Sequence, residues 1–198
     1  MKRVFTRFVL YLLPLTAASG AVHGQVSVIS LDGGYSETCE QASRSIGKSM
    51  TIEITGSRLN ISPLEICTLA IREDASSESR ATNYNNRGVL LFAEGRLEEA
   101  LQDFDQATQL RETLANAHAN RGYTLVALER WAEAVSALDR GIELGAEEAS
   151  KAHFSRAIAH EELGQLPKAY QDYTSAAELD PQWDAPAQEL LRFRVGDN

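Results

Sequence analysis

The sequence predicts an all-α fold, a stack of helical hairpins that forms an α-solenoid. The stretch NNRGVLLFAEGRLEEALQDFDQAT, which begins at Asn85, returns in altered form from Asn120 and again from Ser155. In each stretch, two segments with helical periodicity flank a short turn. Repetition with a period of about 20–50 residues is the signature of a stacked repeat array.

When the three copies are aligned, residues of similar size recur at four positions, or columns, that are expected to form the packing contacts. The copies are separated by 34 and then 35 residues. Small residues are needed where two helices approach closely, and the large residues fill the gap between one hairpin and the next. A single hairpin cannot bury its apolar face, so the copies are expected to share one continuous core. The columns are Gly88, Gly122 and Ala157; Ala100, Ala134 and Ala169; Phe104, Leu138 and Tyr173; and Ala107, Gly141 and Ala176.

Over residues 81–182 these columns resemble the tetratricopeptide repeat (TPR). That family has a small residue in the first helix, then small-x-x-x-aromatic and a further small residue in the second, and Pro at the end. Pro181 matches the final Pro, whereas Glu112 and Ala146 stand there in the first two copies. The resemblance implies a TPR α-solenoid with three clear helix-turn-helix repeats.

The flanking segments are expected to complete this array. Residues 37–80 resemble a degenerate first repeat, with Cys39 on its first helix and Cys67 on its second. Between them, KSMTIEITGSRLNIS alternates like a strand, so residues 49–63 form either strands, as in a two-stranded ribbon, or an irregular loop. Residues 183–198 are expected to form a C-terminal capping helix whose apolar side chains cover the open end of the stack, namely Leu190, Leu191 and Phe193.

Residues 1–24 have the layout of a secretory signal peptide. Three basic residues up to Arg7 flank the start of an apolar run from Phe8 to Leu15. This run is shorter than the roughly 20 residues that a membrane span needs. We therefore expect a periplasmic or secreted protein that is not membrane-embedded after cleavage; an uncleaved N-terminal anchor is the alternative. Residues 25–36 are expected to be flexible.

Charge disfavours nucleic acid as a partner. The chain carries 19 Lys and Arg against 28 Asp and Glu, a formal charge of −9. Removal of the leader takes away three basic residues and brings the charge near −12. Nucleic-acid phosphates need a basic face, which this composition does not offer.

The two cysteines are expected to form a disulfide, because thiols of an exported protein meet an oxidising compartment. A Cys39–Cys67 bridge would close a loop of about 28 residues and contribute about 3 kcal/mol to stability. Two buried free thiols are the alternative.

No set of residues has the spacing of a catalytic, cofactor or metal site. IGKS at Ile46 ends like a phosphate-binding loop, but Ala42 stands where its first Gly belongs. HEELG at His160 begins like a zinc-protease motif, but Gly164 replaces the second His. His118 and His153 are isolated on helices. We therefore expect a protein that is no enzyme and needs no cofactor or metal.

The TPR resemblance implies that the first helices of successive hairpins line a concave groove that binds a peptide. The alternative is that several of these residues are buried between helices. By column, the groove residues are Asn85, Asn86, Val89, Phe92, Asn120, Tyr123, Val126, Lys151, Phe154 and Ile158.

Two polar columns stand out within the first helices. Asn86 and Asn120 are similar to the asparagine ladders of some superhelical TPR proteins, because an amide offers both a donor and an acceptor to a peptide main chain. The alternative is that they bond to neighbouring helix backbone. Basic residues follow in the next column and are equally able to form ion pairs with acidic residues of adjacent helices, namely Arg87, Arg121 and Arg156.

These observations favour a non-catalytic exported TPR protein that binds a protein or peptide in its concave groove. The alternative is a structural subunit of a cell-envelope complex, or a homo-oligomer, that captures no peptide. The partner itself is not specified by the sequence.

Overall fold

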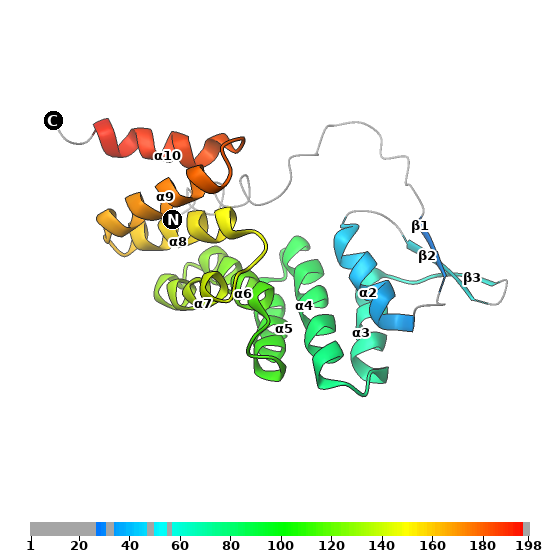
Figure 1. Ribbon diagram of the computed structural model, residues 1–198. Coiled ribbons are helices and arrows are strands. Elements are labelled where there is room, and N and C mark those ends of the chain that lie inside the picture. The colour runs from blue at the N-terminus through cyan, green and yellow to red at the C-terminus, as the bar shows by residue number, and fades with distance from the viewer. Residues whose placement is uncertain (1–26, 31–33, 47–49, 55–56, 196–198) are drawn as a thin grey trace. The chain divides into compact units, whose positions relative to one another are not determined.

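A computed structural model of the chain describes residues 27–30, 34–46, 50–54 and 57–195 (Figure 1). The predicted signal peptide, residues 1–24, lies outside these ranges. Helices make up most of the described residues, so the predicted fold class is confirmed. They are α2 (Gly34–Arg44), α3 (Pro63–Glu73), α4 (Ser77–Ala93), α5 (Leu97–Leu110), α6 (Ala115–Ala127), α7 (Trp131–Glu143), α8 (Ala149–Glu162), α9 (Leu166–Leu179) and α10 (Asp184–Val195).

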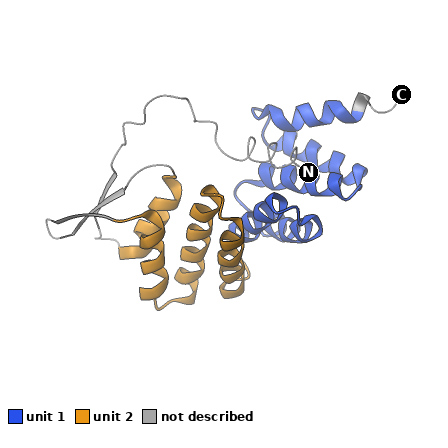
Figure 2. Ribbon diagram, turned by 180° about the vertical axis from the view of Figure 1, so that it is seen from behind, with its two compact units in different colours: residues 1–16, 115–198 blue, residues 17–114 orange. Residues whose placement is uncertain are grey.

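The described residues form two compact units (Figure 2). The N-terminal unit ends at Leu114 and holds helices α2 to α5; the C-terminal unit begins at Ala115 and holds α6 to α10. The first repeat copy is the α4–α5 hairpin of the N-terminal unit. The second and third copies are the α6–α7 and α8–α9 hairpins of the C-terminal unit.

A three-stranded sheet belongs to the N-terminal unit. Strand β2 (Met50–Ile54) pairs antiparallel with β3 (Ser57–Asn60), with Thr51 opposite Asn60. Of the alternatives left open for residues 49–63, the ribbon is therefore the one observed. Strand β1 (Ser27–Ser30) pairs parallel with β2 and lies within the segment expected to be flexible. Its SVIS sequence contains two adjacent β-branched residues, which favour strands.

In the first and second copies, the two helices of the hairpin pack together where a glycine on the first helix faces a large side chain on the second, sixteen positions later. A Cβ atom on Gly88 would lie 2.7 Å from Cε1 of Phe104, and one on Gly122 would lie closer still to Leu138. Phe104 and Leu138 are fully buried. The absent Cβ atoms therefore leave the space that these side chains fill, as the first and third columns predicted.

The α6 and α7 backbones approach each other at a second glycine. A Cβ atom on Gly141 would lie 2.9 Å from the backbone nitrogen of Ala119. A flexible side chain could move away, but a backbone nitrogen within a helix cannot. The fourth column thus sets the separation of the two helices in this hairpin.

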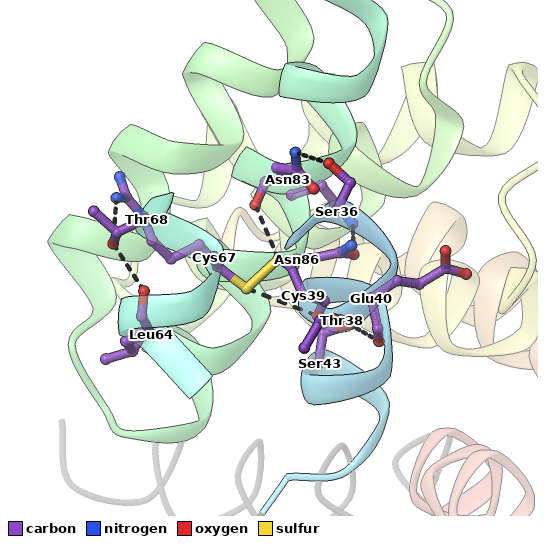
Figure 3. The surroundings of a disulfide bond; sticks show 12 residues. Ser36, Thr38, Cys39, Glu40, Ser43, Leu64, Cys67, Thr68, Asn83 and Asn86 are labelled. Carbon is purple, nitrogen blue, oxygen red and sulfur yellow. Dashed lines mark hydrogen bonds between the residues drawn. A yellow bond between two sulfur atoms is a disulfide. The ribbon is translucent and has the colours of Figure 1, made fainter. Parts of the chain in front are cut away.

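Helices α2 and α3 form the degenerate hairpin that was predicted before the first clear copy. A capping box starts α3, in which Ser62 accepts from the Glu65 amide and Glu65 accepts from the Ser62 amide. The predicted disulfide joins Cys39 of α2 to Cys67 of α3, and both residues are fully buried (Figure 3).

Helix α10 covers the last hairpin as expected, with one correction. Trp183, Leu190 and Phe193 pack against a buried cluster that includes Phe154 and Tyr173. Leu191, predicted to help cover this end, is instead 58% exposed. Residues 190 and 193 lie on one face of a helix, whereas residue 191 is turned about 100° away from 190.

The turn inside each clear hairpin has a residue in the left-handed region of backbone space. Gly95, Glu129 and Gly164 have φ of 75°, 60° and 72°. The residue after each one donates its amide to a carbonyl five positions back, for example Arg130 to Leu125 at 2.8 Å. These are Schellman motifs, which favour glycine because a Cβ atom is strained at positive φ. The second copy therefore has a non-glycine residue in a strained position.

We predict that Glu129→Gly stabilises the protein. Relief of the left-handed strain favours the folded state by about 1–2 kcal/mol, and the extra freedom of glycine in the unfolded chain offsets part of it. The net gain should be about 0.5–1 kcal/mol in urea unfolding followed by circular dichroism. Glu129→Ala is the control and should show no such gain. Equal stability of the Gly and Ala variants would contradict the argument.

Candidate ligand-binding face

Three of the ten predicted groove residues follow one stripe along α4. Asn85, Val89 and Phe92 are each half-buried, and their spacing puts them on one side of the helix. Val89 and Phe92 also pack in part against the buried cluster of Leu91, Ala100 and Phe104. This stripe therefore leaves part of one polar side chain and part of two apolar side chains exposed to solvent.

Asn86, which was predicted to bond the main chain of a bound peptide, is only 7% exposed. It lies beside the disulfide and α2 (Figure 3). Its Oδ1 is 3.5 Å from Nδ2 of Asn85, and its Nδ2 has no hydrogen-bond partner. The structure thus shows neither an open amide nor the expected bond to a neighbouring helix backbone. The reason is that α2 packs across α4 at this point.

In the C-terminal unit, polar residues of α6 hold the chain that leads into α8. The hydroxyl of Tyr123 donates to the carbonyl of Glu148 at 3.4 Å, and Oδ1 of Asn116 accepts from the amide of Glu147 at 3.0 Å. Burial raises the pKa of Tyr123 well above its ordinary value. Tyr123 is only 8% exposed, so most of its surface serves internal packing.

Two further predicted groove residues are core residues. Val126 and Phe154 are each 1% exposed, which corrects the expectation that they line an open surface. The Phe154 ring lies 5.4 Å from that of Tyr173 and 4.8 Å from that of Trp183. Phe154 therefore makes one of the aromatic contacts between the third hairpin and the α10 segment. The half-buried residues that remain are Asn120, Lys151 and Ile158, of which Lys151 pairs with Glu148.

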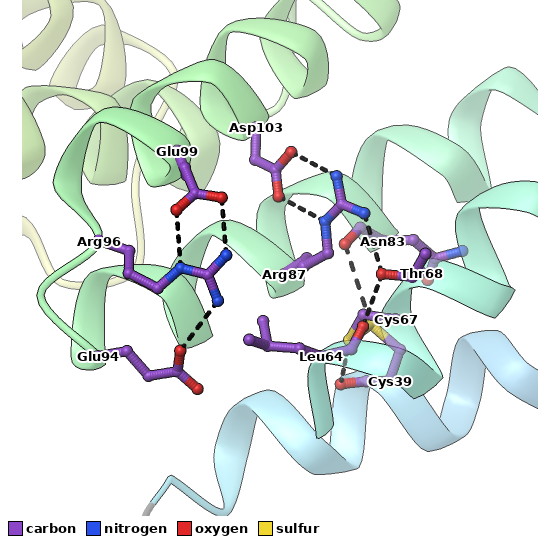
Figure 4. A network of polar contacts seen from close by, with 10 residues as sticks. All are labelled: Cys39, Leu64, Cys67, Thr68, Asn83, Arg87, Glu94, Arg96, Glu99 and Asp103. Atoms are coloured by element: carbon purple, nitrogen blue, oxygen red, sulfur yellow. Dashed lines mark hydrogen bonds and ion pairs between the residues drawn. A yellow bond between two sulfur atoms is a disulfide. The ribbon is translucent and has the colours of Figure 1, made fainter. Parts of the chain in front are cut away.

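Two members of the arginine column, Arg87 and Arg156, form the ion pairs with acidic residues of adjacent helices that were predicted for them. Arg87 of α4 donates to both carboxylate oxygens of Asp103 on α5, each at 2.8 Å, and to Oγ1 of Thr68 on α3 at 3.1 Å (Figure 4). The bond to Asp103 raises the pKa of Arg87. Asp103 is 5% exposed, so this bidentate pair links three helices at low solvent access.

A pocket of about 270 Å³ opens beside this ion pair, between α3, α4 and α5. A second bidentate pair, between Arg96 and Glu99, stands at its edge (Figure 4). Both guanidinium groups already have carboxylate partners. The pocket is lined by Leu64, Glu65, Thr68, Arg87, Leu91, Arg96, Glu99, Gln102 and Asp103.

The third copy repeats the same pair and extends it. Arg156 of α8 donates to both oxygens of Asp172 on α9, at 2.8 and 2.6 Å, and to Asp139 on α7 at 2.6 Å. Nδ1 of His153 lies 2.9 Å from Oδ1 of Asp172, so His153 is not isolated, contrary to expectation. Burial alone would raise the pKa of Asp172, but its bonds from Arg156 and His153 outweigh burial and lower it.

The acidic partners were missed in the sequence, although a signal for them exists. Asp103 and Asp172 lie sixteen positions after their arginines, the same offset that joins Gly88 to Phe104. In the second copy Ala137 stands at that position. Residues sixteen apart in this repeat face each other across the hairpin, so the pairs could have been predicted for two copies.

The described part of the chain shows no group of three His, Cys, Asp or Glu residues placed to hold a metal ion. Within the same ranges, every helix is too short or too polar to cross a membrane. The described residues thus offer partly exposed helix faces, internal ion pairs and a pocket beside one of these pairs.

Comparisons with known proteins agree with this architecture. Residues 88–128 match a family model described as TPR repeat, and residues 120–182 match one described as tetratricopeptide repeat. The TPR repeats are thereby confirmed. The chain is 33% identical over 117 residues to the DnaJ homolog subfamily C member 7 homolog of Schizosaccharomyces pombe. The aligned segment makes up 57% of this chain and 24% of that protein.

Two further proteins are similar. The mitochondrial import receptor subunit TOM70 of Rattus norvegicus is 31% identical over 112 residues, or 54% of this chain and 18% of the receptor. The chain thus spans about a quarter or less of these two relatives. The first TPR of Spaghetti (RPAP3), solved with an HSP90 peptide bound, has a TM-score of 0.56 at 23% identity, over 60% of this chain and 93% of that one. This likeness concerns the fold alone.

We predict that acidification destabilises the C-terminal unit in part through His160. This residue is 6% exposed, its Nδ1 has no hydrogen-bond partner, and burial lowers its pKa against the opposing attraction of Asp172. The unfolded chain therefore takes up this proton first as pH falls below about 6.5, so stability falls with pH. The lowered pKa of Asp172 acts in the same direction below about pH 4.

Urea unfolding of His160→Gln between pH 7 and 5 checks this expectation. The variant should lose less stability over that range than the parent protein. Gln182→Asn, a neutral change at an exposed position of the same unit, serves as the control and should keep the parent's slope. A parent-like slope for His160→Gln would refute the assignment.

Proposed function

From the TPR repeats of this chain, we propose that it is a non-catalytic exported protein that binds a protein or peptide segment along the first helices of its hairpins. The observation that carries the proposal is the stripe of Asn85, Val89 and Phe92 on α4, where a half-buried amide side chain lies beside two partly exposed apolar side chains. Partly exposed apolar groups beside polar ones are typical of peptide-binding surfaces.

Several findings support this reading. TPR relatives include a mitochondrial import receptor, and a structural neighbour was solved with a bound HSP90 peptide. The Cys39–Cys67 disulfide fits an oxidising compartment, and the N-terminal sequence has the layout of a leader, so we propose a periplasmic location.

The ligand proposed here differs from an acidic peptide tail. Lys151 is the single basic residue among the ten predicted groove residues, and its ammonium pairs with Glu148. The chain as a whole is acidic. An extended segment that offers main-chain amides and apolar side chains suits these residues better than one that offers carboxylates.

Substitution on the proposed face should weaken capture of the partner. The full-length chain would be expressed in a bacterial host, recovered from the periplasm and used in pull-downs with cross-linking at position 85. Val89→Lys and Phe92→Lys should each weaken recovery at least about tenfold, which corresponds to about 1.4 kcal/mol. Leu179→Lys, at a 55% exposed leucine elsewhere, is the matched control. Undiminished recovery with folded variants would exclude this face.

A second candidate function, self-assembly or a fixed place in an envelope complex, is favoured by a different observation. Tyr170 is 41% exposed and Leu166, one turn earlier on α9, is 50% exposed. The Tyr170 ring also contacts that of Phe193 at 5.8 Å. These side chains extend an apolar surface beyond the core of the C-terminal unit.

Light scattering of the purified chain tests this alternative. If this surface joins two copies, the protein should be a dimer at micromolar concentration and Tyr170→Lys should make it monomeric. Lys168→Tyr, which adds an aromatic residue on the same helix, should leave the dimer intact. A monomeric parent protein would exclude self-assembly through α9.

A further inference from the structure

Helix α2 lies against α3 and α4 with few apolar side chains of its own. Cys39 and Ala42 are its buried apolar residues, and Tyr35 is partly buried. Its other buried residues bond within the helix: Thr38 donates to the carbonyl of Gly34, and Ser43 donates to that of Glu40. Packing of an apolar face is what normally fixes a short helix, and α2 has little of it.

The surface beneath α2 is polar and incompletely satisfied. Asn83 is 1% exposed; its Nδ2 donates to Oγ of Ser36 on α2 at 2.8 Å and to Asp74 at 3.3 Å, but its Oδ1 has no partner. Asn86, one turn later, has an unpartnered Nδ2. Both residues lie beside α2 (Figure 3). Docking of α2 gains two hydrogen bonds at Ser36, one from Asn83 and one to Asp74 at 2.6 Å. It also removes Oδ1 of Asn83 and Nδ2 of Asn86 from water without giving either atom a bond, which opposes docking.

The disulfide between Cys39 and Cys67 keeps α2 docked despite the cost of burying these unpartnered amide atoms. We propose that α2 is a redox-dependent cover: it stays docked while the disulfide is intact and is released when the disulfide is reduced, which opens the Asn83–Asn86 face of α4. This face then presents an acceptor and a donor one turn apart, the pair needed to bond the N–H and C=O of an extended polypeptide. The release of α2 does not depend on the proposed function, whereas binding of a ligand to the exposed face rests on it.

The redox step is ordinary thiol–disulfide exchange with a dithiol reductant. One thiolate of the reductant attacks a cysteine sulfur, the S–S bond breaks, and the other cysteine leaves as a thiolate that takes up a proton. The second thiolate of the reductant then attacks the mixed disulfide and releases the remaining cysteine. The reductant is oxidised to its own disulfide, and Cys39 and Cys67 receive its two electrons. Because both sulfurs are fully buried, attack requires a transient opening of α2.

The release is expected to be local, because the rest of the N-terminal unit has other ties. Leu91, Ala100 and Phe104 form a buried cluster in the α4–α5 hairpin. Arg87 of α4 bonds both Thr68 of α3 and Asp103 of α5. None of these contacts involves α2.

Hydrogen exchange of the full chain, with and without dithiothreitol, tests the cover directly. Amides of α2 should exchange about 100-fold faster after reduction, the effect expected for loss of a cross-link that closes a loop of this length. Amides of α3 to α5 should keep their protection. Ser36→Ala, which removes the hydrogen bonds of Ser36 with Asn83 and Asp74 but keeps the disulfide, should leave α2 protected in the oxidised protein. Equal protection of α2 in the two redox states, or joint loss over α2 to α5, would overturn the proposal.

A second measurement uses Cys67 as a reporter. In Cys39→Ala it is the one cysteine left in the chain, and a docked α2 would keep it buried. Its reaction with a neutral maleimide should come within about tenfold of the rate in urea; a rate more than about 100-fold slower would overturn the proposal. If α2 is released but the partner is captured no better by reduced protein, the cover stands and the proposed ligand role of the asparagines fails.

Discussion

The close approach of two helices within a hairpin is the constraint on which the structure depends. Gly88 and Gly122 have no Cβ atom at the points where the side chains of Phe104 and Leu138 pack against them, and Gly141 lies against the backbone of Ala119. The large side chain then fills the space between the helices and becomes fully buried. In the third copy Ala157 and Tyr173 share one core cluster at the same offset. Such a core needs only a small residue and a large one sixteen positions apart.

The arginine–aspartate pairs follow from the same geometry. Once residues sixteen apart face each other, Arg87 and Asp103, or Arg156 and Asp172, meet with both carboxylate oxygens engaged. Because these aspartates are about 5% exposed, loss of either partner would leave a buried charge. The pairs therefore make the register of two hairpins specific, while the second copy, with Ala137 at that position, relies on apolar packing.

The sequence was most informative where a position repeats and least where it occurs once. The hairpins and the small and large columns were predictable, since three copies impose the same constraint; the disulfide was predictable because the chain has only two cysteines and an N-terminal sequence typical of an export leader. The groove was only partly so: column matching placed Phe154 and Val126 on an open face, whereas each is buried. The burial of Phe154 depends on Trp183, which has no counterpart in the repeat. Likewise, burial of Asn86 depends on α2, which has a different sequence from the clear copies.

The two ends of the repeat series are closed by different chemistry, and this explains why one of them has a cross-link. At the C-terminal end, α10 follows Trp183 and brings Leu190 and Phe193 onto Phe154 and Tyr173, so aromatic area fixes the cap. At the N-terminal end, α2 meets the polar side chains of Asn83 and Asn86 with little apolar area. A helix that cannot be fixed by burial needs another tie, and the bond between Cys39 and Cys67 supplies it. The same lack of apolar contact that makes the disulfide necessary for docking also makes α2 the helix that could leave without disturbing the core behind it.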